Sequence, residues 1–333
     1  MSSSTRQVVV ITGASAGVGR ATARAFAKEG AKIGLLARGK AGLEGARKDV
    51  EELGGEAIAI STDVADADQV EAAAQQVEDI FGPIDVWVNN AMTSVFSPVK
   101  EMQPEEYRRV TEVTYLGFVY GTLSALKRML PRDQGTIIQV GSALAYRGIP
   151  LQSAYCGAKH AIQGFTDSLR AELIHDGSNV HVTEVHMPAL NTPQFGWVKS
   201  RLPNKPQPVP PIYQPEIAAE AIVWSAHNKR RELLVGGPTQ IAVNGNKIAP
   251  AFGDWYLAQG GYESQQGPEP TEPDRQHNLW EPVPGDHGAH GSFDDMSRTS
   301  SPQLWASMNR GPLALAIAGV TSVLGAAIFW RSR

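Results

Sequence analysis

The sequence has one cysteine, Cys156, among its 333 residues. A single thiol cannot form an internal disulfide, and there is no CxxC pair to hold a metal ion. Cys156 directly follows a tyrosine and has no base placed by spacing, so we interpret it as a small packing residue rather than a nucleophile. The lack of disulfides is compatible with a reducing cytoplasm.

Blocks of positive charge are also missing. The chain carries 30 Lys and Arg against 34 Asp and Glu, for a net charge of −4. This balance argues against nucleic acid as a partner. The apolar run near the N-terminus is too short for a signal peptide and leads straight into glycines. Internal repeats are not visible, and the Asp and His residues of Asp286–His290 are too few to predict a metal site.

What the N-terminal region does contain is a β-branched run followed by glycines. Gln7–Thr12 (QVVVIT) predicts a buried parallel strand, and the stretch that ends at Glu29 predicts a helix. Between them the glycines are spaced GxxxGxG, not GxGxxG. Such glycines let the backbone approach a pyrophosphate, which the helix N-terminus stabilises. A plain glycine turn is the alternative; we predict a cofactor loop made of Gly13, Ser15, Ala16, Gly17, Val18 and Gly19.

A second motif lies near the middle of the chain. Tyr155 and Lys159 are spaced i, i+4, so they share one helix face and the ammonium can lie beside the phenol. Tyrosine ordinarily titrates near ~10, and a nearby cation lowers that pKa toward neutrality. Ser142 follows Thr136–Val140, a predicted strand, at the end where open α/β sheets bind ligands. The alternative is a tyrosine and a lysine on the surface of an ordinary helix.

Together, TGxxxGxG and the later Ser…YxxxK resemble the short-chain dehydrogenase/reductase family over about residues 5–262. The resemblance implies one α/β domain with a doubly wound Rossmann-type parallel sheet. It implies hydride transfer between NADP(H) and a carbonyl/alcohol pair. Tyr155 would be the acid/base, Ser142 would bind the carbonyl oxygen, and Lys159 would lower the Tyr155 pKa and hold the nicotinamide ribose. It also implies a homo-oligomer.

The same resemblance assigns further cofactor contacts and one departure. Thr114 occupies the position of an asparagine that completes a catalytic tetrad by holding a water relay. A hydroxyl cannot replace both the donor and the acceptor of an amide, so we expect Thr114 to support the relay less well. Met92 and Ala189 replace family glycines. The implied cofactor contacts are Asp63 and Val64 at the adenine, Asn90 in the cleft, and Pro188 and Thr192 at the nicotinamide end.

Cofactor preference can be predicted from the end of the second strand. Lys32–Ala37 predicts that strand, and Arg38 follows where NAD-binding folds place an acid for the ribose 2′-OH. A guanidinium suits the 2′-phosphate of NADP. A solvated arginine is the alternative.

The substrate region is predicted from aromatic and proline-rich sequence. Gln194–Gln214 holds several prolines and aromatic residues and matches the family's variable lid, which would line an apolar pocket. The predicted preference for NADP and the membrane tether predicted for the C-terminus lead us to expect reduction of an apolar ketone or aldehyde. The competing hypothesis is an NADP-binding scaffold or redox sensor, tethered to a membrane, with little turnover.

The C-terminal region has a different composition. Residues 263–311 are rich in Pro, Gly and charged residues, which predicts a disordered linker, with Leu279 and Trp280 as exceptions that dock on the domain. Leu313–Trp330 is nearly all apolar and uncharged, and arginines bracket it. We predict a transmembrane helix over 312–330, long enough for a bilayer, with the catalytic domain in the cytoplasm. An apolar helix packed on the domain is the alternative.

Overall fold

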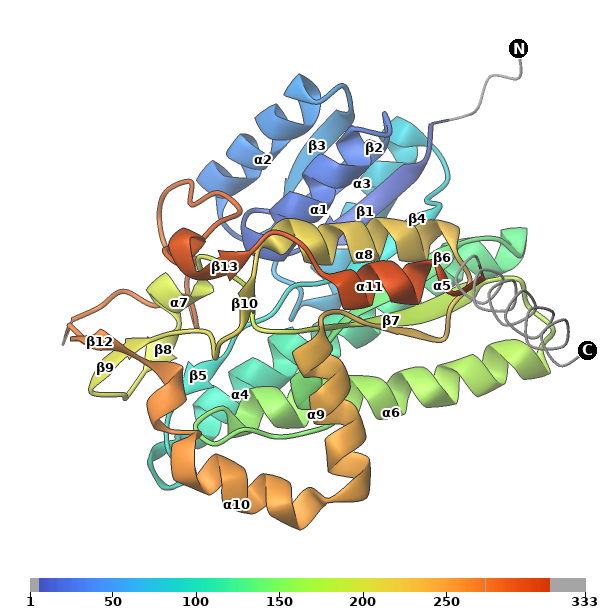
Figure 1. Cartoon of the computed structure of the whole chain (residues 1–333). Coiled ribbons are helices and arrows are strands. Elements are labelled where there is room, and N and C mark those ends of the chain that lie inside the picture. Colours follow the sequence, from blue (N-terminus) through green and yellow to red (C-terminus); the bar gives the residue numbers. More distant parts are fainter. Residues whose placement is uncertain (1–5, 273, 312–333) are drawn as a thin grey trace, which may run out of the picture.

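The computed structural model describes residues 6–272 and 274–311. Its centre is a seven-stranded sheet, parallel throughout, in the order β11-β7-β6-β4-β1-β2-β3 (Figure 1). The chain winds outward from β1 on one side and from β4 on the other, which confirms the doubly wound fold. The strands are β1 (Val8–Thr12), β2 (Lys32–Ala37), β3 (Glu56–Ser61), β4 (Val86–Asn89), β6 (Thr136–Ser142), β7 (His181–Met187) and β11 (Glu232–Leu234).

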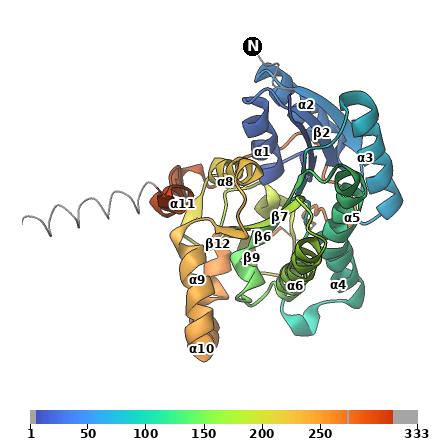
Figure 2. The same ribbon diagram turned by 90° about the vertical axis from the view of Figure 1, so that its right-hand side faces the viewer.

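Helices cover both faces of the sheet, as Figure 2 shows edge-on. One core packs beneath α1 (Gly17–Ala27), α2 (Lys40–Glu52) and α8 (Pro215–His227). The other packs beneath α3 (Ala67–Phe81), α5 (Gly117–Met129) and α6 (Ser153–His175). Because both faces are covered, the central strands are apolar runs; all five residues of β1 are buried.

The helical region between β5 (Val95–Phe96) and β6 is interrupted. It consists of α4 (Pro104–Thr111), a π-helical turn at Glu112–Leu116 and then α5. Single π-helical turns of this kind are rare and occur often at functional sites. This turn holds the position that the family resemblance marks as catalytic.

Shorter elements surround the carboxyl end of the sheet. Three two-stranded ladders form there, and α9 and α10 project from the body as a hairpin (Figure 1). Pro250 begins α10 directly after the end of α9, so the helical stretch breaks at Ala249. These elements are β5 (Val95–Phe96), α7 (Gln194–Trp197), β8 (Lys199–Ser200), β9 (Asn204–Pro206), β10 (Ile212–Tyr213), α9 (Gly237–Ile248), α10 (Pro250–Gly260), β12 (Gln266–Pro270), β13 (Ser297–Arg298) and α11 (Pro302–Met308).

The expectation of a disordered linker over 263–311 is wrong for the described part of that segment. Its strands β12 and β13 pair with β9 and β10, and α11 packs near β11. Leu279 is fully buried, which confirms that it docks, whereas Trp280 stays 44 % exposed. The composition of this segment predicted disorder because the segment has too few apolar residues to form a core of its own. Its backbone instead finds partners on the domain that it covers.

The predicted membrane span, residues 312–330, lies outside the described residues. Across 6–272 and 274–311, no helix combines the length and apolar character that crossing a bilayer requires. The anchor and its orientation therefore stay predictions.

Candidate active site

The glycine loop joins β1 to α1. Gly13 has φ +67°, and a Cβ there would lie 2.8 Å from the Cα of Ala91, so only glycine fits. A Cβ on Gly19 would overlap the carbonyl oxygen of Gly13. Asn90 holds the loop from behind, because its Nδ2 donates to the carbonyl oxygen of Thr12 at 2.9 Å. The glycines thus let a phosphate approach the backbone at the N-terminus of α1, and these residues fit a dinucleotide.

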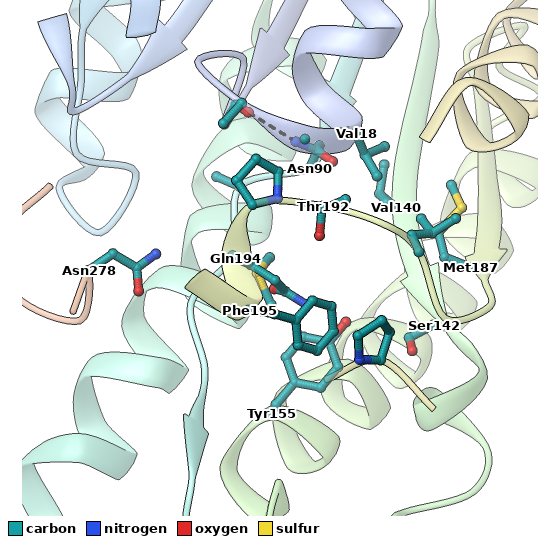
Figure 3. A pocket seen from close by; sticks show the side chains of 18 of the residues that line it. Val18, Asn90, Val140, Ser142, Tyr155, Met187, Thr192, Gln194, Phe195 and Asn278 are labelled. Carbon is teal, nitrogen blue, oxygen red and sulfur yellow. Dashed lines mark hydrogen bonds between the residues drawn. The ribbon is translucent and has the colours of Figure 1, made fainter. Parts of the chain in front are cut away.

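One cavity of about 460 Å³ lies at the carboxyl ends of the strands, where the fold predicts a ligand site (Figure 3). Gly19 and Thr114 are the two predicted site residues that do not line it. Gly19 lies beneath the loop, whereas Thr114 is completely buried. The predicted residues that do line the cavity are Gly13, Ser15, Ala16, Gly17, Val18, Arg38, Asp63, Val64, Asn90, Ser142, Tyr155, Lys159, Pro188 and Thr192.

Ser142, Tyr155 and Lys159 come together from two elements. Ser142 is the last residue of β6, and its Oγ accepts a hydrogen bond from the backbone N–H of Leu144 at 3.1 Å. Tyr155 and Lys159 lie in the first two turns of α6. The Lys159 Nζ donates to the carbonyl oxygen of Val140 at 2.6 Å and lies 5.6 Å from the centre of the Tyr155 ring. The i, i+4 prediction for this pair is therefore met.

The pKa values of the two groups differ from the expectation. Burial raises the pKa of Tyr155, and this effect is larger than the opposing hydrogen bond from Ser142. Burial also lowers the pKa of Lys159 to about 7. The ammonium is therefore only partly populated at neutral pH in the cofactor-free protein, and it does not offset the burial of the phenol. The prediction that Lys159 lowers the Tyr155 pKa is not met, because burial dominates and Lys159 is not among the groups that shift this pKa. A raised pKa keeps the phenol protonated, as a proton donor must be.

Thr114 has a structural role that its sequence position did not indicate. Its hydroxyl donates to the carbonyl oxygen of Thr93 at 2.9 Å and accepts from the N–H of the same residue at 3.0 Å. Both hydrogen-bonding functions are used, and no part of the side chain reaches the cavity. We therefore assign Thr114 to holding the loop after β4 against the π-helical turn.

Replacing Thr114 with valine should lower the free energy of unfolding by about 1–3 kcal/mol. The change keeps the shape but leaves the buried N–H and C=O of Thr93 without partners. Urea unfolding measures the effect, and Thr111→Val is the matched control, since Thr111 is exposed and bonds only the Tyr107 carbonyl of its own helix. Equal stability of the two variants would contradict this role.

Asp63 lines the cavity and accepts a hydrogen bond from Arg109 at 2.5 Å. It does not cap the next helix, because α3 begins after Asp66, whose carboxylate accepts from two backbone N–H groups. The position of Asp63 shortly before a helix would also have allowed a capping role, but Asp66 takes it.

The other end of the cavity is mainly apolar. Its walls come from the lid around α7, from the loop after β6 and from α9, and Figure 3 labels Phe195 of the lid and Tyr155 among the lining side chains. The segment 194–214 thus lines the pocket as predicted, while the contribution of α9 was not foreseen. The apolar residues at this end include Leu144, Ile149, Phe195, Trp197, Val209 and Ala242.

Sequence reasoning missed one wall of the cavity entirely. This wall comes from the segment that was expected to be a linker, and Asn278 lies across the pocket from Ser142 in Figure 3. The only signal for it was the apolar pair Leu279 and Trp280 within a polar stretch. Its other members are Pro282, Val283, Gly285 and His287.

The residues singled out as a weak metal tract are otherwise engaged. Asp286 forms an ion pair with Arg20, and His290 bonds Glu216 and Asp294. Across the described residues, no group of three or more His, Cys, Asp or Glu is arranged to hold a metal ion.

A glycine loop at a helix N-terminus, joined in one cavity to Ser142, Tyr155 and Lys159, defines a Rossmann-type oxidoreductase site. Comparison with known proteins agrees. The family model for short chain dehydrogenases matches residues 7–201. The chain therefore belongs to the short-chain dehydrogenase/reductase family.

Individual relatives cover most of the chain. It is 34% identical to an uncharacterized oxidoreductase, YxnA, of Bacillus subtilis, over 84% of this chain and 80% of that protein. It is 33% identical to the 3-dehydrosphinganine reductase of Danio rerio, over 66% of this chain and 68% of that enzyme. Among solved structures, an alcohol dehydrogenase of Thermococcus sibiricus complexed with 5-hydroxy-NADP matches with a TM-score of 0.59 and 30% identity. That match covers 69% of this chain and 96% of the archaeal one.

Proposed function

We propose that this protein is an NADP(H)-dependent reductase of an apolar ketone or aldehyde. The observation that carries the proposal is the placement of Ser142, Tyr155 and Lys159 in one cavity with the glycine loop and Arg38. The similar archaeal enzyme is complexed with 5-hydroxy-NADP, and the relative from Danio rerio is named as a 3-dehydrosphinganine reductase. The apolar far end of the cavity supports a substrate of that character.

In the proposed reaction, the bound nicotinamide supplies a hydride to the carbonyl carbon. Tyr155 donates its phenolic proton to the carbonyl oxygen as negative charge develops there, which yields the alcohol and a phenolate. Ser142 donates a hydrogen bond to the same oxygen and fixes its position. Lys159 stabilises the phenolate once the proton has left, because a cation beside the ring favours the ionised form.

The raised Tyr155 pKa is compatible with the protonated phenol that reduction requires. Reduction needs the protonated phenol, and burial keeps it protonated across the neutral range in the cofactor-free protein. Oxidation of an alcohol would need the phenolate at the start.

The proposal is tested by following NADPH consumption at 340 nm with the full chain and a panel of carbonyl compounds. The panel should pair short polar ketones with long-chain ketones and aldehydes of equal reactivity. We expect turnover with the long-chain members. NADPH binding without turnover on any member would instead favour the scaffold or sensor hypothesis.

Replacing Arg38 with alanine should weaken NADPH binding by about 10- to 100-fold, the usual scale for a charge-assisted hydrogen bond. NADH binding should change much less, because only NADPH offers a 2′-phosphate to the guanidinium. Titration of both cofactors by fluorescence measures the ratio of the two dissociation constants, with NADH as the internal control. If binding of NADPH and NADH weakens equally, Arg38 does not recognise the 2′-phosphate.

A further inference from the structure

One wall of the cofactor cavity is a C-terminal segment with no part in the sheet. We call residues 278–291 the strap. In Figure 1 it belongs to the orange segment between β12 and β13, which rises beside α1 and α2. Five of its residues line the same cavity as the glycine loop, Arg38 and Asp63. The strap therefore covers the side of the cavity that the loop and Arg38 form.

The first end of the strap holds Arg38. The two terminal nitrogens of its guanidinium donate to the carbonyl oxygens of Asn278, at 2.5 Å, and Trp280, at 2.6 Å. The carbonyl between them, that of Leu279, accepts from Nε of Arg109 at 3.1 Å. Three successive carbonyls thus hold two arginines. Arg38 lines the cavity and is the predicted ligand of the 2′-phosphate, whereas Arg109 bonds Asp63, another residue of the lining.

The second end of the strap lies on the glycine loop. The carbonyl oxygen of Gly288 accepts a hydrogen bond from the backbone N–H of Gly17, at the start of α1, at 3.1 Å. Asp286 forms an ion pair with Arg20, whose side chain is nearly buried. A backbone carbonyl of the strap therefore accepts a hydrogen bond from one of the N–H groups at the helix N-terminus, the end that attracts anions.

The strap also touches the substrate lid. The N–H of Asn278 donates to the carbonyl oxygen of Trp197 at 3.0 Å, and the ring of His287 lies edge-on to Trp197 with centres 4.6 Å apart. One segment thus connects the lid, the arginine and the glycine loop. Most of these links are polar, and Leu279 and Ala289 are the only strap hydrophobics in the buried core, so local opening is feasible.

We propose that the strap positions Arg38 for NADP(H) and has to detach before the dinucleotide can enter or leave. The proposal rests on the proposed function, since it concerns the same cofactor site. When the strap is closed, two of its carbonyls hold the guanidinium of Arg38 at the cavity. The closed strap also covers a dinucleotide bound at the glycine loop. Cofactor exchange is then limited by opening of the strap rather than by contacts to the nicotinamide.

The first test loosens the strap in the full chain. Asp286→Asn removes the charge that pairs with Arg20, and Asp295→Asn is the matched control. Asp295 is an exposed acid in the same segment, with no hydrogen bond or ion pair among the described residues. NADPH is preloaded and displaced by excess NADP⁺ in a stopped-flow fluorimeter. We expect release at least about tenfold faster in Asp286→Asn, since interface changes act mainly on dissociation rates, and unchanged release in the control.

The second test locks the strap. A Cβ added to Gly45, in α2, would lie 2.6 Å from Cγ of Asp286, so Gly45→Cys with Asp286→Cys brings two thiols within reach of a disulfide. The native Cys156 is buried and far less accessible to oxidant. The oxidised protein should bind and release NADPH at least about tenfold more slowly than the same protein after reduction.

The outcomes separate the strap from the proposed function. Equal exchange in the oxidised and reduced double variant, with the disulfide verified by mass, would overturn the strap while leaving the reductase intact. Failure of the wild-type protein to bind NADPH would overturn the proposed function, and the strap with it. If Asp286→Asn also weakens NADPH binding more than NADH binding, this would support the claim that the strap positions Arg38.

Discussion

Replacing Tyr155 with phenylalanine is expected to lower kcat by at least about 100-fold, the usual contribution of general acid catalysis. The ring and its packing remain, but the proton for the developing alkoxide is lost. NADPH affinity should stay within a few fold, because the hydroxyl is needed for the chemical step rather than for binding. Steady-state kinetics and an NADPH titration measure the two quantities on one preparation.

Tyr107→Phe is the matched control for this change. Tyr107 is a half-buried tyrosine whose hydroxyl bonds Ser153, two residues before Tyr155, but it does not line the cavity. Its loss should leave kcat nearly unchanged. If the two variants lose activity equally, the Tyr155 effect is structural and another group donates the proton.

Replacing Lys159 with methionine should abolish most turnover and yet make the cofactor-free protein more stable at pH 7. The ammonium is buried, with one hydrogen bond to Val140 and the ring of Phe118 4.5 Å away. A methionine of similar length removes the desolvation cost. We expect kcat to fall by about 100-fold or more, and the free energy of unfolding to rise by on the order of 2 kcal/mol.

The stabilisation expected from Lys159→Met depends on pH. Burial lowers the pKa of Lys159 to about 7, below that of an unfolded lysine near ~10.4. Between these values the unfolded chain binds more protons than the folded one, so this group makes stability rise with pH. The advantage of Lys159→Met should therefore be full below about pH 7 and should disappear as the pH approaches ~10.4.

Urea unfolding at several pH values tests this, with Lys100→Met as the control. Lys100 is exposed and forms no ion pair among the described residues, so its replacement should show no such trend. A Lys159→Met protein that is less stable than the wild type at every pH would show that the ammonium is favourably solvated inside the protein. A lysine held at such a cost is typical of functional sites, where stability is lower than the sequence could achieve.

Much of the fold and site could be predicted from local patterns. The run Gln7–Thr12, the glycines after it and the spacing of Tyr155 and Lys159 all act over a few residues. Strand formation, helix N-termini and i, i+4 contacts follow directly from such short-range order. These patterns predicted the first strand, the cofactor loop and a Ser–Tyr–Lys group, whereas the doubly wound sheet was implied by the family resemblance that the motifs carry.

Only the tertiary structure decided what depends on contacts far apart in the sequence. Arg38 is held by a carbonyl 240 residues away, and Thr114 by the backbone of a residue 21 positions earlier. The same holds for the pKa of Tyr155, because burial is a property of everything packed around the ring. Composition indicated a linker over 263–311, since it measures whether a segment can form its own core. It carries no information on whether another part of the chain supplies the partners, and here the domain supplies them.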